Sequence, residues 1–180
     1  SQMLSGERTS VASKVGQLRL KCEWKRMFQH GEALPSLNEA EFRAFSQNGE
    51  DGILLYIFSL LGFGSRTCVE ICAGDGIQCN SANLILNHGW TGLLIDGNED
   101  NVNRGVQFYA SHPDTFCFPP KFVRAWVDRE GVNDLIQGHG FIGDIDLLSL
   151  DLDGVDYWIW DAIEVIRPRV VVAETQCIWG

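Results

Sequence analysis

The sequence predicts an α/β fold in which helices cover both faces of a parallel sheet. Short and nearly continuous apolar runs recur between residues 67 and 173, and segments with helical periodicity separate them. Strands that are buried on both faces of a parallel sheet have this continuous apolar character, whereas half-exposed strands alternate. The chain has 180 residues, of which 45% are hydrophobic, so it is long enough to enclose such a core.

Residues 1–45 are polar and irregular, and we expect them to form a basic, polar N-terminal extension. Residues 1–30 hold six basic and two acidic side chains, which leaves a charge of −14 for the rest of the chain. One side of a short helix could be formed there by Leu18, Cys22 and Met27 or Phe28.

From residue 46 onward, helices and strands are expected to alternate in a domain that spans residues 46–180. A first helix follows the acidic pair Glu50 and Asp51 and ends at Gly62, because glycine favours helix termini. Arg167-Pro168 is expected to break the last helix. The expected helices are 53–61, 80–87, 98–110, 131–137 and 155–166, and the expected strands are 67–71, 93–96, 122–127, 145–150 and 169–173.

Polar and glycine-containing turns follow the expected strands. Right-handed crossovers place all of these turns at the carboxyl edge of a parallel sheet, where ligands of such folds bind. We therefore expect the functional residues in five segments, which are 72–80, 96–98, 127–129, 150–156 and 174–179.

The turn after the first strand reads Glu70-Ile71-Cys72-Ala73-Gly74-Asp75-Gly76. Glycines at such a turn let the backbone approach a ligand closely. A dinucleotide-binding GxGxxG loop would need a third glycine where Cys79 stands, which disfavours a nicotinamide cofactor. An ordinary turn of a parallel sheet is the alternative without a ligand.

Asp96 ends the second strand, twenty residues after Gly76. A carboxylate at this place can accept hydrogen bonds from both ribose hydroxyls of a nucleoside, and the spacing suits either a nicotinamide dinucleotide or S-adenosylmethionine. Asp96 could instead cap the following helix.

Two further segments stand out beside the glycine turn, namely Ser46-Gln47-Asn48-Gly49-Glu50-Asp51 and residues 146–154, read as Asp-Leu-Leu-Ser-Leu-Asp-Leu-Asp-Gly. Together the three segments resemble class I S-adenosylmethionine-dependent methyltransferases of the FkbM type. The sequence departs from the family pattern at Cys72, Ser149 and Asp153, where the family has glycine, commonly lysine, and glutamate. The resemblance implies a Rossmann-like doubly wound, mostly parallel sheet with strand order 3-2-1-4-5. It also implies that the family's antiparallel C-terminal strands are missing, so that the domain is truncated.

The resemblance also implies the site residues and the cofactor, S-adenosylmethionine. Asp151 and Asp153 would be catalytic and would face the reacting methyl group. Apart from the resemblance, Trp126 follows the third strand near Asp128 and could contact an adenine ring, although core packing is expected for most of the tryptophans. The residues expected to bind the cofactor are Gln47, Glu70, Gly74, Asp75, Gly76, Asp96, Asn98 and Asp128.

The function that these observations predict is O-methylation of a small molecule or sugar by direct in-line transfer. An acidic pocket suits a cationic sulfonium better than a phosphate-rich dinucleotide. A catalytically inactive nucleotide-binding or interaction module is the alternative, favoured by Cys72 and the abrupt C-terminus, and an NAD-dependent oxidoreductase is a weaker one. Asp151, Asp153 and Asp156 could together hold a divalent cation, but we expect no metal.

Composition limits the other partners. The net charge of −10 argues against nucleic acid, which needs a concentrated basic surface. No apolar stretch is long enough to span a membrane, and we expect a soluble, cytoplasmic protein whose six cysteines are reduced. A minimal five-stranded form is the alternative to a truncated domain, and its exposed sheet edge would be covered by the N-terminal extension or by a second subunit of a homo-oligomer.

Overall fold

The computed structural model describes residues 3–174 of the chain, with side chains from residue 14 onward. The chain forms two compact units, Ser1–Phe63 and Gly64–Gly180. No helix among the described residues is long and apolar enough to cross a membrane. The domain boundary expected at residue 46 stays a prediction.

The first unit is helical and contains α1 (Met3–Gln29), α2 (Leu37–Ala40) and α3 (Glu50–Leu61). The expectation of an irregular N-terminus is therefore wrong, because α1 is a helix of 27 residues. Trp24 is buried in this unit and packs edge-on against Tyr56 of α3, with 5.2 Å between the ring centroids. Leu18 and Cys22, which were expected to form one side of a short helix, lie on α1 and are exposed.

Asp51, in the first turn of α3, is hydrogen-bonded to the chain that precedes the helix. One carboxylate oxygen of Asp51 accepts hydrogen bonds from the backbone N–H groups of Ala44, Phe45 and Ser46, at 2.7–2.8 Å. The backbone N–H of Asp51 donates in return to the Ser46 hydroxyl, at 3.1 Å. This exchange satisfies N–H groups that precede the helix and would otherwise lack partners.

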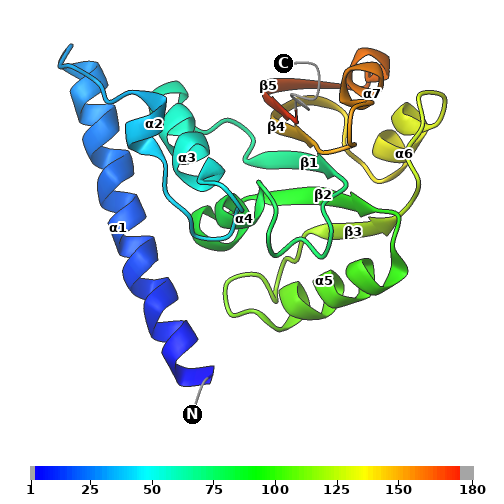
Figure 1. Ribbon diagram of the computed structural model, residues 1–180, viewed down its shortest axis with the longest axis horizontal. Helices are drawn as coiled ribbons and strands as arrows, with labels where there is room; N and C mark the ends of the chain where they lie inside the picture. The colour runs from blue at the N-terminus through cyan, green and yellow to red at the C-terminus, as the bar shows by residue number, and fades with distance from the viewer. Residues whose placement is uncertain (1–2, 175–180) are drawn as a thin grey trace. The chain divides into compact units, whose positions relative to one another are not determined.

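The second unit contains a five-stranded sheet in the order β3-β2-β1-β4-β5, and every neighbouring pair is parallel (Figure 1). The α/β fold class and the strand order expected from the sequence are confirmed. The strands are β1 (Thr67–Ile71), β2 (Thr91–Asp96), β3 (Lys121–Arg124), β4 (Gly143–Leu150) and β5 (Ile166–Ala173).

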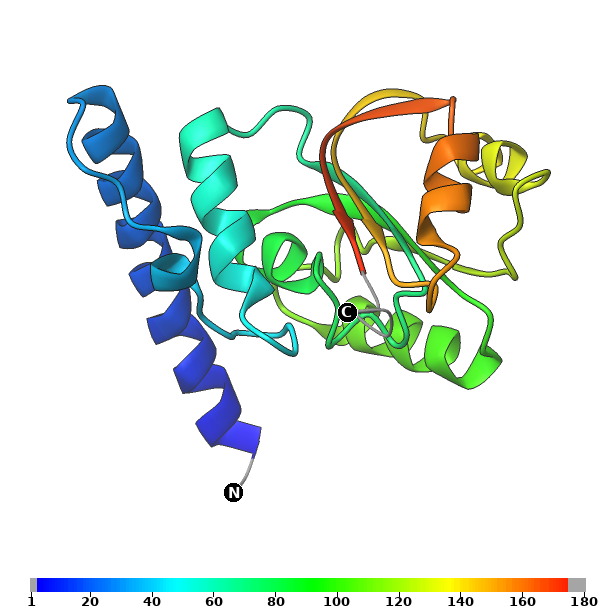
Figure 2. The ribbon, with the colours of Figure 1, turned by 45° about the horizontal axis from the view of Figure 1, so that its top comes forward.

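Helices cover both faces of this sheet (Figure 2). Ile136 of α6 and Ile159 of α7 join one core with Val69, Ile71, Leu93 and Leu148. The strand side chains of the opposite face meet the other two helices: Glu70 bonds Ser81 at the start of α4, and Phe122 contacts the Tyr109 ring of α5. The helices are α4 (Ala82–His88), α5 (Glu99–Ser111), α6 (Val132–Gly138) and α7 (Asp156–Ala162).

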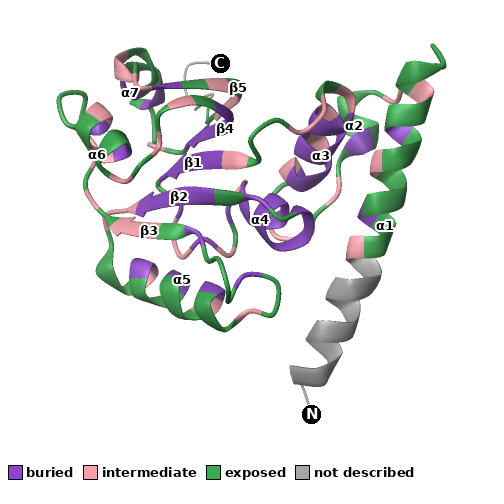
Figure 3. Ribbon diagram, turned by 180° about the vertical axis from the view of Figure 1, so that it is seen from behind, coloured by how far each residue is buried: buried purple, intermediate pink, exposed green. Residues whose placement is uncertain are grey.

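The central strands β1, β2 and β4 are almost wholly buried, whereas the sheet edges are partly exposed (Figure 3). This contrast explains why the central strands were predicted well. The edges differ from expectation, because β3 ends at Arg124 instead of residue 127 and α7 ends at Ala162 instead of residue 166.

Arg167-Pro168 was expected to break the last helix, but α7 already ends at Ala162 and Pro168 lies within β5. Among the described strands, β5 pairs only with β4, so it is an edge strand. On the unpaired side of an edge strand, the missing N–H of a proline removes no hydrogen bond of the sheet.

Candidate functional site

The turn after β1 has the left-handed backbone that its glycines permit. The φ angles of Gly74 and Gly76 are 59° and 70°, and Cys72 adopts 63° although it carries a side chain. A Cβ on Gly76 would lie 2.5 Å from Cζ of Phe122, so only glycine fits there. A Cβ on Gly74 would meet no atom within 4 Å, so this part of the turn faces open space.

Glu70 is buried and only 4% exposed, and its carboxylate holds the turn in place. One oxygen accepts from the backbone N–H of Asn80 at 2.9 Å and from the Ser149 hydroxyl at 3.1 Å. The other accepts from the backbone N–H and the hydroxyl of Ser81. Glu70 therefore positions the loop between β1 and α4, and Ser149 extends this bonding to β4.

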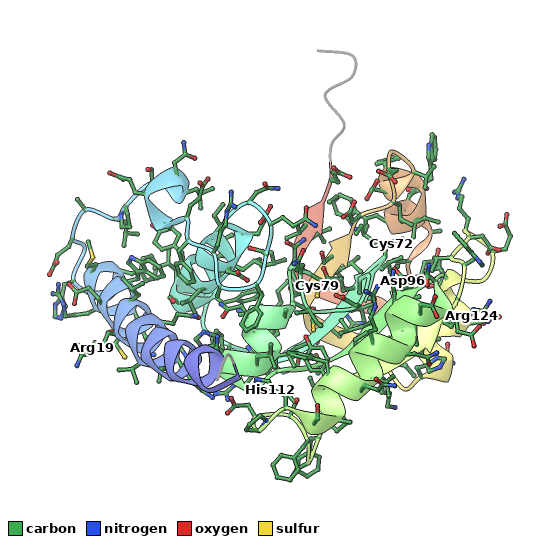
Figure 4. The ribbon with its side chains drawn as sticks, turned by 60° about the horizontal axis from the view of Figure 1, so that its bottom comes forward. Arg19, Cys72, Cys79, Asp96, His112 and Arg124 are labelled. Atoms are coloured by element: carbon green, nitrogen blue, oxygen red, sulfur yellow. The ribbon has the colours of Figure 1, made fainter. Side chains whose placement is uncertain are left out.

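Asp96 lies beside the glycine turn, at the carboxyl edge of β2. One carboxylate oxygen accepts from the backbone N–H of Gly74 at 2.9 Å, and the other accepts from the Asn98 backbone N–H at 2.8 Å. Figure 4 shows Cys72 and Asp96 at the same edge of the sheet. The side-chain oxygen of Asn98 caps α5 by accepting from Asp100 and Asn101. Asp75 accepts from the backbone N–H of Ile77 at 3.1 Å.

Trp126 and Asp128 follow β3 at the same edge. Trp126 is 87% exposed, and its indole lies against Gly97, where a Cβ would come within 2.9–3.0 Å of the ring atoms. A large aromatic face thus stands open to solvent next to Asp96. Asp128 accepts from the backbone N–H of Gly131 at 2.7 Å, just before α6.

Three exposed carboxylates meet where β4 and β5 end. Atoms of Asp151, Asp153 and Glu174 lie within 4.8 Å of one another. A shared hydrogen bond with Asp151 and the charge of that group raise the pKa of Glu174. Such a set could hold a divalent cation, but apart from their acidity nothing in the described part of the chain points to one.

The other aspartates of the acidic run do not join this group. Asp156 accepts from the backbone N–H groups of Leu152 and Gly154, at 3.0 and 3.1 Å. Asp144 pairs with Arg167. Asp146 is buried and pairs with Arg169 at 2.7 Å. Of the three aspartates considered as possible cation ligands, Asp151 and Asp153 therefore lie together without Asp156, and Glu174 lies with them.

Glu174 was missed as an individual residue, although residues 174–179 were expected to lie at the functional edge. The parallel register explains its position, because the Glu174 N–H donates to the carbonyl of Leu150 at 3.3 Å. The rest of that segment, with Cys177, lies outside the described residues.

Cys72 lies between the two groups of carboxylates. Partial burial and the charges of Asp96 and Asp151 raise its pKa to about 11. The thiol is therefore protonated at neutral pH and is a poor nucleophile.

Gln47 belongs to the first unit, where its side chain is exposed. Its predicted role in cofactor binding stays a prediction. The residues that the fold does bring to one edge are Gly74, Asp75, Gly76, Asp96, Asn98, Asp128, Asp151 and Asp153.

Comparison with known proteins gives few matches. No protein-family model matches the chain, and no curated protein matches it. Among solved structures, it is similar to a putative protein-L-isoaspartate O-methyltransferase from Plasmodium falciparum that was crystallised with S-adenosyl-L-homocysteine. The identity is 12%, the TM-score is 0.43, and the match covers 74% of this chain but only 65% of that protein. A likeness at this level does not establish a shared activity.

Proposed function

We propose that the chain is an S-adenosylmethionine-dependent methyltransferase that methylates an oxygen of a small molecule or sugar. The observation that carries this proposal is the arrangement at the β1 and β2 exits. The Asp96 carboxylate accepts a hydrogen bond from the backbone N–H of Gly74, where the glycine turn faces open space. The exposed indole of Trp126 lies against Gly97, the residue after Asp96. A nucleoside presents a polar diol and a flat base, and these groups match the carboxylate and the indole.

The residues proposed to bind the cofactor would contact different parts of it. Asp96 would accept hydrogen bonds from the ribose hydroxyls, and Gly74 and Gly76 would let the backbone of the turn approach the ligand. Trp126 would stack on the adenine, with Asp128 close to the ring edge. Glu70 would act indirectly, because its oxygens already hold the loop.

S-adenosylmethionine supplies a methyl group on a positively charged sulfur. The carboxylates of Asp151 and Asp153 would favour a cation at this edge and would orient the acceptor hydroxyl in line with the methyl group. One of them would accept the hydroxyl proton while the acceptor oxygen forms its bond to the methyl carbon and the carbon–sulfur bond breaks.

Calorimetric titration of the full chain with S-adenosylhomocysteine, S-adenosylmethionine and NAD tests the proposal. We expect saturable binding of the first two and none of NAD. Binding of S-adenosylhomocysteine should also quench tryptophan fluorescence, and a Trp126→Leu variant should lose most of that quenching. Absence of saturable binding of either adenosyl compound would overturn the proposal. Binding without methyl transfer to any hydroxyl compound would favour the inactive nucleotide-binding module.

A further inference from the structure

The Asp96 carboxylate is also bonded by a side chain of α5, that of Asn101. The amide nitrogen Nδ2 of Asn101 lies 3.2 Å from Oδ1 of Asp96. The same oxygen accepts from the backbone N–H of Asn98 at 2.8 Å, and Oδ2 accepts from that of Gly74 at 2.9 Å. These donors come from the glycine turn, from the segment before α5 and from α5 itself, so together they fix the orientation of the carboxylate.

Arg104 determines which end of the Asn101 amide faces Asp96. Nη2 of Arg104 donates to Oδ1 of Asn101. A guanidinium can only donate and an ionised carboxylate can only accept, so the amide presents its oxygen to Arg104 and its nitrogen to Asp96. The three side chains therefore form a hydrogen-bond chain in which each donor points toward Asp96.

Capping of α5 does not account for the position of the Asn101 side chain. Asn101 is the third residue of α5, and in a capping box the side chain at this position bonds the backbone N–H of the N-cap residue. Here the N-cap residue is Asn98, and its N–H already donates to Asp96. The Asn98 side chain in turn accepts from the backbone N–H groups of the first turn. The Asn101 amide bonds the Asp96 carboxylate instead.

We propose that Asn101 is a positioning residue that holds the Asp96 carboxylate in the orientation that the ribose hydroxyls of the cofactor require. This inference rests on the proposed function, because it assigns a task in cofactor binding to a residue that acts only through Asp96. Asn101 is half-buried and Arg104 is exposed, so water would replace the amide if it were removed. A mobile water does not fix the direction of a carboxylate, and ordering that group on binding would then cost affinity.

Calorimetric titration of the full chain tests this role by comparing S-adenosylhomocysteine with its dideoxy analogue, which lacks both ribose hydroxyls. Asn101→Ala should weaken binding of S-adenosylhomocysteine by about three- to tenfold and leave binding of the dideoxy analogue nearly unchanged. The matched control is Asn103→Ala, which removes an exposed asparagine from the same helix and should bind both ligands normally. Equal weakening of both ligands by Asn101→Ala would indicate a merely structural role and would overturn the inference.

Further substitutions test the direction of the hydrogen bonds. Asn101→Asp keeps the size of the side chain but places a second negative charge beside Asp96, so it should weaken S-adenosylhomocysteine binding more than Asn101→Ala does. Asn101→Gln keeps the amide and should recover part of the lost affinity. If Asn101→Asp binds S-adenosylhomocysteine as tightly as the unaltered chain, no donor is needed at this position and the inference is wrong.

Arg104→Met tests whether Arg104 acts through Asn101. It should weaken S-adenosylhomocysteine binding less than Asn101→Ala does, and it should have no further effect in a chain that already carries Asn101→Ala. Additive losses would show that Arg104 acts independently and would overturn the proposed hydrogen-bond chain.

Binding by the unaltered chain is a separate readout of the proposed function. If the unaltered chain binds S-adenosylhomocysteine and Asn101→Ala binds it equally well, the proposed function stands and only the role of Asn101 is wrong. If the unaltered chain does not bind S-adenosylhomocysteine, the proposed function is overturned, and this inference with it.

Discussion

The two halves of the carboxyl edge of the sheet differ in the surroundings of their acidic groups. At the β1 and β2 exits, the oxygens of Glu70 and Asp96 accept hydrogen bonds from nearby backbone N–H groups. At the β4 and β5 exits, Asp151, Asp153 and Glu174 are exposed and close together.

Under the proposed function, the two halves have different roles. The hydrogen bonds of Glu70 and Asp96 fix the backbone at the β1 and β2 exits before a ligand binds, which suits a cofactor site. The exposed half brings three like charges close together at the surface, so the affinity of a ligand for this half should depend more strongly on the charge of the ligand. The following predictions test this contrast.

The largest effect should come from Glu70, whose carboxylate joins β1, β4 and the start of α4. Glu70→Ala should lower the free energy of unfolding by about 3 kcal/mol, because it leaves several buried N–H and hydroxyl groups without a partner. Urea unfolding followed by circular dichroism measures this loss. The matched control is Glu164→Ala at an exposed position, where a change of less than about 0.5 kcal/mol is expected. Equal stability of the two variants would show that this carboxylate does not hold the loop between β1 and α4 in place.

The next largest effect should come from Asp96, and it should be mainly an effect on ligand affinity. Asp96→Ala should weaken S-adenosylhomocysteine binding by about tenfold or more, because a hydrogen bond to a charged group contributes about 1.5–3 kcal/mol. Calorimetry provides the affinity, and circular dichroism checks that the fold is kept. Asp100→Ala, which removes an exposed carboxylate from the first turn of α5, serves as the control and should bind normally. Unchanged affinity of Asp96→Ala would exclude the ribose assignment.

A smaller effect is expected at Cys72, because its left-handed backbone costs a residue with a side chain about 1–2 kcal/mol. Cys72→Gly should remove that cost and raise the free energy of unfolding by about 1 kcal/mol or less, since glycine also gains freedom in the unfolded chain. Cys72→Ala keeps the Cβ and should bring no gain. A Cys72→Gly variant no more stable than Cys72→Ala would show that the turn is unstrained.

The smallest effect concerns the titration of Glu174. Its pKa is raised by the hydrogen bond and the charge of Asp151, so folding favours the protonated form. Its contribution to stability is therefore present below the ordinary glutamate pKa and is lost as the pH rises through the raised value. NMR titration should give a midpoint above that of an ordinary glutamate, and Asp151→Asn should lower it. A midpoint that Asp151→Asn leaves in place would show that the two groups are not coupled.

The sequence predicted best where local pattern and burial agree. The limits of β1 were predicted without error, since Thr67–Ile71 is rich in β-branched and apolar residues and is followed by a glycine turn. Asn98 was placed at the start of the following helix and is its N-cap. Both features depend on neighbours within a few residues, which is the range that periodicity and capping cover.

The sequence did not predict which side of α1 is buried, nor which residues neighbouring strands bring together. The buried face of α1 includes the polar Gln17 beside Trp24, so a search for an apolar stripe found the exposed side instead. Pro168 predicted a break, but an edge strand tolerates a residue without an N–H. Glu174 could not be linked to Asp151 until the register of β4 and β5 was known.

The sequence by itself determined the fold class and the edge of the sheet at which polar residues gather, because apolar runs and crossover handedness decide these, and its resemblance to a known family implied the strand order. Only the tertiary structure decided how those polar residues are used. It separated carboxylates that hold the backbone, such as Glu70, from those that stay exposed, such as Asp151 and Glu174. The hydrogen-bond partners of Glu70 lie 10 to 79 residues away from it, and no local pattern in the chain records them.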